Sequence, residues 1–398
     1  MRKTREELDK LREELGTDRL WSYSRVNAYQ TCSYSYYLKY IKREKEDVGG
    51  VYLDFGNAIH DALEKFYNGE KDFSFINEAF EETKFASLTL AENKFNNADE
   101  DKNKAIEEKY LACLDHFTKN HVICPHKVVS EAFVATTLTD EKSKKKYHFM
   151  GYVDAMHYEP LYAEDDADKT SDLGGTLYIT DYKTSTRYSG AKIAEHANQL
   201  ILNALGFSQT TGFPLTRIRA RWNFLKYMTI SYVQKNKKVK ETIAERHAWV
   251  DKIKVNLRAR LNEIEGLTDI ERESMVMEAV TNNNLDNMPE SIKEAYSFDD
   301  AFVYVDLSLE NVYNVVNDLI LVLEEIIEKE SKNDPEEFKK TVMDSDSYYC
   351  SQLCGFRDRC PHYKEYIDNK MLFINKPKED ADAKQDENDD WLKELGII

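Results

Sequence analysis

Four strand-like segments in the middle of the chain constrain the fold more than any other feature. They are Val128–Leu138, Tyr147–Tyr158, Thr176–Thr184 and Ile218–Val233. Apolar residues at helical spacing predict a helix around Ile193–Leu205, between the third and the fourth segment. Strands interrupted by a helix in this way are typical of an α/β core.

Helical patterns surround this core on both sides. They cover Arg2–Leu15, Ser22 to about Ile41, Gly56–Tyr67 with the region to Asn120, and then Lys238–Gly266 and Asn311–Lys332. We therefore expect a helical N-terminal region (1–125), an α/β core (126–235) and a second helical region (236–370). The acidic tail, 371–398, has the composition of a disordered segment.

Length and charge limit the class of protein. With 398 residues and 41% hydrophobic content, the chain can bury one large core or two. No apolar run approaches the ~20 residues needed to span a bilayer, and Met1–Lys10 lacks the apolar segment of a secretory signal. We therefore expect a cytoplasmic protein with no membrane partner. The net charge of -18 argues against a surface that attracts nucleic acid everywhere, but it allows a local basic groove.

Basic residues are concentrated between Arg217 and Arg260, where they greatly outnumber the acidic ones. Aromatic residues, among them Trp222, Phe224 and Tyr227, run through the first part of this region. The combination suits contact with a nucleic-acid backbone together with base stacking, although a solvated hairpin and helix would have a similar composition. The candidate DNA-binding residues are Arg217, Arg219, Arg221 and Lys226.

Two of the strand-like segments carry a carboxylate among apolar residues. Asp181 and Lys183 end the third segment two residues apart, so alternation along a strand sends both to the same face. Asp154 lies in the second segment, within Gly151-Tyr152-Val153-Asp154. A carboxylate can hold a hard cation, and a lysine beside it can steady an anionic substrate. An isolated Asp-x-Lys is usually a solvated pair, but two acids near one lysine indicate a site.

Four of the six cysteines supply a second, independent signal. Cys350, Cys354 and Cys360 lie close together in the sequence, whereas Cys32 stands far upstream. In an intracellular protein, clustered cysteines indicate a metal centre before a disulfide. By number, four thiolates suit tetrahedral zinc or an iron–sulfur cluster equally well. The C-x3-C-x5-C spacing and the proline after Cys360 favour the cluster, with zinc and unligated thiols as the alternatives.

Taken in order, these motifs resemble the RecB-type branch of the PD-(D/E)XK nuclease superfamily. Within it they are similar to the iron–sulfur nucleases that include the CRISPR-associated adaptation nuclease and the nuclease domain of the AddB helicase subunit. The matching motifs are Ser22-x-Ser24 with Cys32 and Tyr37, Gly56-x-x-x-His60, Gly151-x-x-Asp154, Asp181-x-Lys183-Thr184 and Gln199-Leu200. The chain departs from the family where Asn203 replaces a tyrosine, where three residues separate Cys350 from Cys354, and in the length between Asp154 and Asp181.

The resemblance implies a restriction-endonuclease-like core, that is, a mixed central sheet flanked by helices, with a helical N-terminal part and a cysteine-ligated iron–sulfur segment. The implied ligands of a 4Fe-4S cluster are Cys32, Cys350, Cys354 and Cys360. The implied ligands of Mg²⁺ or Mn²⁺ are His60, Asp154, Asp181 and the backbone carbonyl of Tyr182. The implied catalytic residues are Asp154, Asp181, Lys183 and Gln199, and Glu131 on a neighbouring strand is a weaker candidate.

The function implied by the resemblance is that of a divalent-metal-dependent DNA exonuclease. Such an enzyme would prefer single-stranded DNA or DNA ends and act in recombination, repair or replication, in a bacterial cell or a phage-infected host. The alternative is a DNA-binding scaffold subunit of a helicase or recombinase complex with little or no nuclease activity. Filled catalytic positions favour the nuclease. The sequence has no G-x-x-x-x-G-K-[ST] motif, so unwinding would need a partner such as a helicase, a recombinase or a single-strand-binding protein.

Overall fold

The computed structural model describes residues 2–46, 50–89, 95, 100–162, 172–234 and 237–374. The chain divides into two compact units, one of residues 1–31 and 49–332, the other of residues 32–48 and 333–398. Most of the acidic segment predicted to be disordered, from residue 375 onward, lies outside the described residues. None of the helices within the described ranges is long and apolar enough to cross a membrane.

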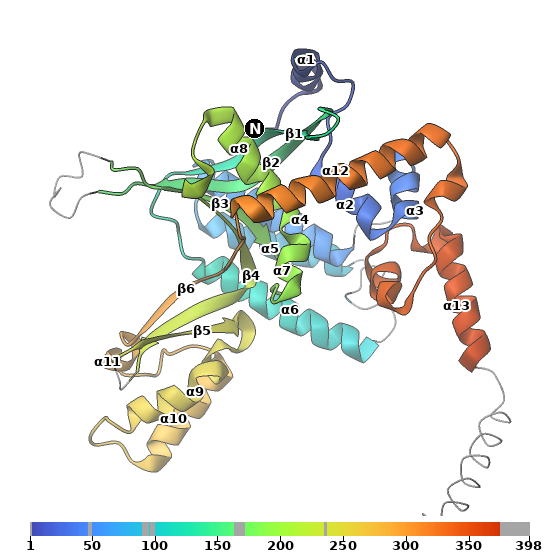
Figure 1. The fold of residues 1–398 in the computed structure, drawn as a ribbon. Helices are drawn as coiled ribbons and strands as arrows, with labels where there is room; N and C mark the ends of the chain where they lie inside the picture. The colour runs from blue at the N-terminus through green and yellow to red at the C-terminus, as the bar shows by residue number, and fades with distance from the viewer. Residues whose placement is uncertain are drawn as a thin grey trace, which may run out of the picture. The chain divides into compact units, whose positions relative to one another are not determined.

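A mixed six-stranded sheet forms the centre of the larger unit (Figure 1). Its strands are β1 (Val128–Thr139), β2 (Lys146–Glu159), β3 (Thr176–Lys183), β4 (Ile218–Val233), β5 (Val239–Glu245) and β6 (Tyr296–Tyr304). The order is β1-β2-β3-β4-β5, and β6 also pairs with β4. Only β3 and β4 run parallel among these described pairs. The predicted α/β class is confirmed, and the architecture is consistent with a restriction-endonuclease-like core.

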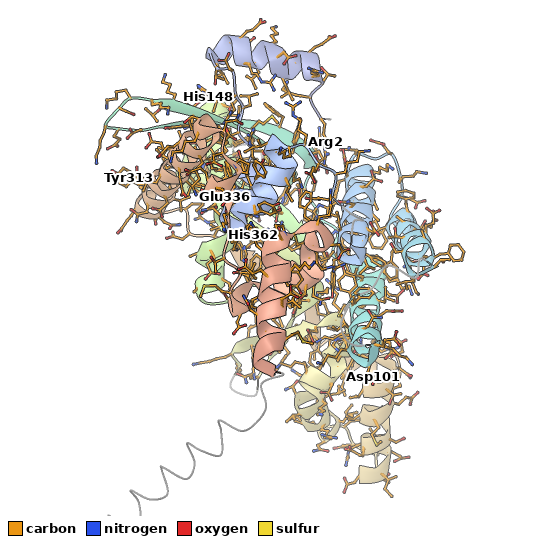
Figure 2. All side chains as sticks on the ribbon, turned by 90° about the vertical axis from the view of Figure 1, so that its right-hand side faces the viewer. Arg2, Asp101, His148, Tyr313, Glu336 and His362 are labelled. Atoms are coloured by element: carbon orange, nitrogen blue, oxygen red, sulfur yellow. The ribbon has the colours of Figure 1, made fainter. Side chains whose placement is uncertain are left out.

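Helices cover both faces of this sheet. In the larger unit they are α1 (Arg5–Leu15), α2 (Tyr23–Thr31), α4 (Val51–Tyr67), α5 (Ser74–Thr89), α6 (Glu100–Asn120), α7 (Ala191–His196), α8 (Asn198–Thr211), α9 (Trp249–Leu261), α10 (Asp269–Asn282), α11 (Glu290–Lys293) and α12 (Leu309–Lys332), with 3₁₀ turns at Leu215–Arg217 and Arg246–Ala248. On one face, Leu200 of α8 and Val312 of α12 share a core with Ile179 of β3. On the other, Phe55 of α4 packs with Tyr182 of β3. Figure 2 shows the side chains that fill these layers.

Helix α8 lies close against the sheet because residue 206 is a glycine. A Cβ atom at Gly206 would lie 2.3 Å from the Thr136 hydroxyl oxygen, closer than any real contact. That hydroxyl donates a 2.9 Å hydrogen bond to the backbone carbonyl of Leu202 in α8. Nearby, the amide oxygen of the buried Asn203 would lie 3.0 Å from a Cβ added to Gly151 of β2. Asn203, where the chain departs from the family pattern, therefore packs between helix and sheet.

The second half of β4 and the first half of β6 extend the sheet into a smaller lobe of the same unit, seen at the lower left of Figure 1. Ile230 of β4, Trp249 and Leu257 of α9, and Ala279 of α10 form its core. The helix predicted over Lys238–Gly266 is wrong in its first part, because Val239–Glu245 pairs with β4 as strand β5. Pairing with a neighbouring strand overrides local preference here. The structure also contains β6 and α10, which the sequence patterns did not predict.

The smaller unit joins two segments that are distant in the sequence. Its elements are α3 (Ser33–Tyr36), α13 (Pro361–Ile374), π-helical turns at Tyr37–Ile41 and Tyr349–Leu353, and 3₁₀ turns at Pro335–Phe338, Asp344–Asp346 and Arg357–Arg359. The helix predicted from Ser22 to Ile41 is therefore interrupted, since Cys32 has extended backbone angles and caps α3. The rings of Tyr36 and Tyr37 stack against Phe338 at 6.1 and 5.4 Å between centroids, which ties the two segments together.

Candidate active site

Asp154 of β2 and Asp181 of β3 face each other on neighbouring strands. The ladder pairs Ala155 with Thr180 and Met156 with Ile179, so Asp154 and Asp181 are the next residues to meet. Asp181 alternates with Ile179 and therefore points to the face that α8 covers. The backbone N–H of Tyr182 donates a 2.9 Å hydrogen bond to Asp154 Oδ2, which fixes that carboxylate beside β3.

The two carboxylates and one ammonium form a tightly packed charged group. Burial, and next the charge of Asp181, raise the pKa of Asp154 to about 6. Lys183 Nζ lies 2.6 Å from Asp181 Oδ2. Burial alone would lower the pKa of Lys183, but the charges of Asp181 and Asp154 outweigh burial and raise this pKa. Lys183 is therefore a cation held against the acids at neutral pH.

His60 on α4 contacts both acid-bearing strands. Its Nε2 atom lies 3.0 Å from the backbone carbonyl oxygen of Tyr182, in hydrogen-bond contact. Its Nδ1 atom lies 3.4 Å from Asp154 Oδ2. Because Asp181 adjoins Tyr182, all four groups predicted to bind a divalent cation lie in one region of the larger unit.

These side chains do not surround a common point as they stand. Over the described ranges, no group of three or more His, Cys, Asp or Glu side chains is placed to hold a metal ion. Their chemistry nevertheless fits a hard dication. The buried Asp181 Oδ2 atom has the Lys183 ammonium, 2.6 Å away, as its one near partner among the described residues. Asp154 and the Tyr182 carbonyl add the oxygen donors that Mg²⁺ and Mn²⁺ prefer.

Two further predicted site residues, Glu131 and Gln199, lie on elements next to the strands that carry the acids. Glu131 lies on β1 opposite Asp154 of β2. The pairing of the two strands is interrupted there, and the Glu131 backbone adopts a φ of 49°. Its carboxylate accepts a 3.1 Å hydrogen bond from Arg2 Nε. Gln199 is the second residue of α8 and is half-buried. Among the described residues it makes no hydrogen bond that would join it to Lys183.

The four basic residues predicted to bind DNA have separate environments. Arg217 donates two hydrogen bonds to the backbone carbonyl of Gly175, the residue before β3. Arg219 donates hydrogen bonds to the backbone carbonyls of Thr216 and Ile218. Arg221 donates to the Thr180 hydroxyl at 3.1 Å, on the face opposite to Asp181. Lys226 lies over the ring of Tyr110, and burial lowers its pKa. Arg219 and Arg221 lie two residues apart on one face of β4, whereas Lys226 packs on Tyr110.

Three aromatic residues near Lys183 were missed from the sequence. Burial raises the pKa of Tyr23 to about 12, and the charge of Lys183 opposes this rise. Tyr188 follows β3 in the chain, and its ring stacks with His196 at 4.2 Å between centroids. Their aromatic type was visible in the sequence, but their position beside the lysine depends on tertiary packing.

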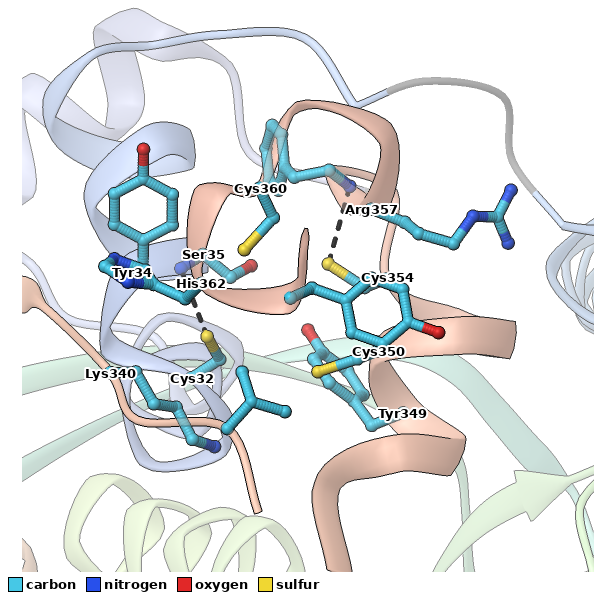
Figure 3. A pocket seen from close by; sticks show the side chains of 13 residues that line it. Cys32, Tyr34, Ser35, Lys340, Tyr349, Cys350, Cys354, Arg357, Cys360 and His362 are labelled. Carbon is cyan, nitrogen blue, oxygen red and sulfur yellow. Dashed lines mark hydrogen bonds between the residues drawn. The ribbon is translucent and has the colours of Figure 1, made fainter. Parts of the chain in front are cut away.

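A second candidate site lies within the smaller unit. Cys32, Cys350, Cys354 and Cys360 line one cavity (Figure 3). Backbone N–H groups donate 3.4 Å hydrogen bonds to the sulfur atoms of Cys32 and Cys354. Burial, and next the neighbouring Cys32, raise the pKa of Cys350 to about 12. All of the cysteines are free thiols.

The donor set of this cavity fits a cysteine-ligated centre. Four thiols meet there, and N–H donation to sulfur is a common way of tuning cluster ligands. The sulfur atoms are not close enough, as they stand in the described ranges, to count as a metal-holding group. A bound centre would have to draw them together and displace their protons.

A search against protein families found one match that covers most of the chain. The family described as the PD-(D/E)XK nuclease superfamily matches residues 20–361. This range contains every candidate residue of both sites. No match was found among curated proteins.

Proposed function

The chain belongs to the PD-(D/E)XK nuclease superfamily, and from this premise we propose that it is a divalent-metal-dependent deoxyribonuclease. The observation that carries the proposal is the meeting of Asp154 with Asp181 and Lys183 on the adjacent strands β2 and β3. Within that group, the buried Asp181 Oδ2 atom lies 2.6 Å from the Lys183 ammonium. Members of this superfamily typically cut DNA with the help of Mg²⁺ or Mn²⁺.

In the proposed site, His60, Asp154, Asp181 and the Tyr182 carbonyl would hold the cation, which supplies Lewis acidity toward the scissile phosphate and the attacking water. Lys183 keeps its proton because two carboxylates face it. It can therefore neutralise a phosphate oxygen or orient the water. The Tyr182 N–H holds the Asp154 carboxylate in place.

Gln199 is proposed to position Lys183 or the phosphate. Its place near the start of α8, the helix on the same face of the sheet as Asp181, supports this role. Glu131, beside Asp154 on the neighbouring strand β1, is a weaker candidate for a further acid.

The proposed reaction is exonucleolytic cleavage that prefers single strands or DNA ends, in recombination, repair or replication. Support comes from the ordered motifs that resemble the RecB-type branch, from Gly56-x-x-x-His60 to Gln199-Leu200. A helicase, recombinase or single-strand-binding protein would be the fitting partner for such an enzyme.

We also propose that Cys32, Cys350, Cys354 and Cys360 hold a 4Fe-4S cluster, since these thiols line one cavity. The purified protein should then be brown, and Cys354→Ser should lose the visible absorption and lower the melting temperature. Cys113→Ser is the matched control, because Cys113 is a buried thiol outside that cavity. If the purified protein is colourless and contains zinc, the four cysteines bind zinc and not an iron–sulfur cluster.

The test of the nuclease uses 5′- and 3′-labelled single strands, the matching duplex and a closed circular strand. Each is incubated with purified protein in Mn²⁺, Mg²⁺ or EDTA. An exonuclease would release label from linear strands only when a dication is present and leave the circle intact. Binding without cleavage in every buffer would instead favour the scaffold function.

A further inference from the structure

The ring of Tyr188 lies one side chain away from the candidate catalytic pair. Strand pairing places Trp222 of β4 beside Asp181 and Phe224 beside Lys183. Neighbouring strands lie about 4.8 Å apart. Tyr188 packs edge-on against both buried rings, with centroids 5.1 Å from Trp222 and 5.0 Å from Phe224. These contacts fix both the position and the plane of Tyr188.

His196 forms the outer layer of the same stack. The two rings are 4.2 Å apart between centroids, and their planes differ by only 19°. His196 is exposed and ends α7, which leads directly into α8 (Figure 1). Burial lowers the pKa of His196, Glu195 opposes this, and the charges of Lys192 and Lys183 add to the lowering. A lowered pKa favours the uncharged imidazole, and the ring is planar in either protonation state.

We propose that the His196–Tyr188 stack is a platform for an unpaired base next to the scissile phosphate. This inference rests on the proposed deoxyribonuclease function and identifies a feature that selects single-stranded substrate. Every base has a π face, so stacking on aromatic side chains accepts any sequence. Bases inside a duplex already stack on their neighbours, so only a single strand or a frayed end gains this contact.

The different surroundings of the two rings distinguish a base-binding platform from simple core packing. Tyr188 is anchored by two buried rings, whereas His196 lies at the surface and adds little to the core. If the stack served only the fold, His196→Ala would lower the melting temperature, and the affinity for DNA would not depend on the bases. A platform would lose base contact while the melting temperature stays the same.

The experiment uses the full chain with Asp181→Asn, so that bound strands are not cut. Single strands carry 2-aminopurine at a terminal position, because the fluorescence of this base is quenched when it stacks. His196→Ala should lose the quenching and bind about 5- to 100-fold more weakly, and His196→Phe should restore both. Replacing the terminal base by an abasic site should weaken binding to the parent protein but not to His196→Ala.

The matched control is His126→Ala. His126 also stacks on a neighbouring ring, that of His157, with centroids 5.8 Å apart and planes within 2°. It lines a cavity with Thr180 and Tyr182, on the other face of the sheet from Asp181. Its loss should leave quenching and affinity unchanged.

The outcomes separate the inference from the function on which it rests. Equal quenching and affinity for the parent and His196→Ala would overturn the platform while leaving the nuclease intact. Equal binding of abasic and intact strands by the parent would do the same. If none of these proteins binds single-stranded DNA, the proposed function itself fails.

Discussion

Asp300 should be one of the most sensitive positions for stability in the larger unit. Its carboxylate accepts hydrogen bonds from Arg246 at 2.6 Å, from Asn223 at 2.7 Å and from the ring of His121 at 2.9 Å. The side chains of Asp300 and Arg246 are each 1% exposed. The group joins β6, β4, the residue that directly follows α6 and the 3₁₀ turn at Arg246–Ala248, so it connects the small lobe to the main sheet.

The burial of this pair sets the size of the loss in unfolding free energy that we expect for Asp300→Asn. Asp300→Asn keeps the volume of the side chain but leaves the guanidinium of Arg246 buried without a counter-charge. Removing one partner of a buried ion pair costs about 3–5 kcal/mol of unfolding free energy. Burial lowers the pKa of Arg246 against the pull of Asp300, but a guanidinium stays protonated, so the pair is ionic.

The control is Glu273→Gln, which makes the same acid-to-amide change at an exposed pair. Glu273 accepts two hydrogen bonds from Arg258, at 2.6 and 2.8 Å, with both side chains more than 40% exposed. Exposed pairs contribute little, so this variant should unfold like the parent. Urea unfolding at pH 7, followed by tryptophan fluorescence, measures both. Similar midpoints for Asp300→Asn and Glu273→Gln would refute the reasoning.

The ion pair of Asp300 with Arg246 also makes the free energy of unfolding depend on pH. Burial alone would raise the pKa of Asp300, but His121 and Arg246 outweigh burial and lower this pKa below its usual value near 4. The stabilisation is therefore present above about pH 4 and is lost as pH falls through the folded pKa. The difference in stability between the parent and Asp300→Asn should narrow as pH falls below about 4, through the folded-state pKa of Asp300.

Three further predictions test the packing and the site. Gly206→Val should cost about 1–3 kcal/mol in urea unfolding, because its Cβ would meet the Thr136 hydroxyl oxygen at 2.3 Å. Phe80→Ala should cost about 3–5 kcal/mol, since Phe80 is fully buried, while Phe85→Ala, at a ring 79% exposed, should leave the unfolding midpoint unchanged. His60→Gln should raise the Mn²⁺ concentration for half-maximal DNA cleavage by about 10- to 100-fold, because His60 contacts Asp154 and the Tyr182 carbonyl; an unchanged requirement would remove His60 from the cation site.

Long strands with apolar alternation were predictable from the sequence. The segment Thr176–Thr184 corresponds to β3, and Ile218–Val233 to β4, because buried positions recur along both. Strand β5 was mistaken for helix because three of its residues are exposed in a row and only pairing with β4 orders them. Strand β6 was missed because Asp299 and Asp300 interrupt its apolar pattern. The acid at 300 is tolerated only because Arg246 neutralises it, a partner that no local pattern reveals.

The candidate site was predictable where residues share a strand and not where tertiary packing decides. Asp181 and Lys183 lie two apart on β3, so their common face follows from alternation alone. The contact of His60 with Asp154 needs α4 to lie beside the sheet, which only the family resemblance implied. Arg221 was grouped with Arg217 by sequence proximity, but its contact with Thr180 places it away from the acids. Tyr188 escaped notice because its position depends on Trp222 and Phe224.

The measurement that tests the central claim most directly is Mn²⁺-dependent release of label from single-stranded DNA by the parent, Asp181→Ala and Lys183→Ala. The parent should degrade the strand and lose activity in EDTA. Both variants should be inactive while retaining the visible absorption of the parent, because neither residue lies in the smaller unit, which holds the four cysteines. Undiminished digestion by either variant would contradict the assignment of Asp181 and Lys183 as the catalytic pair.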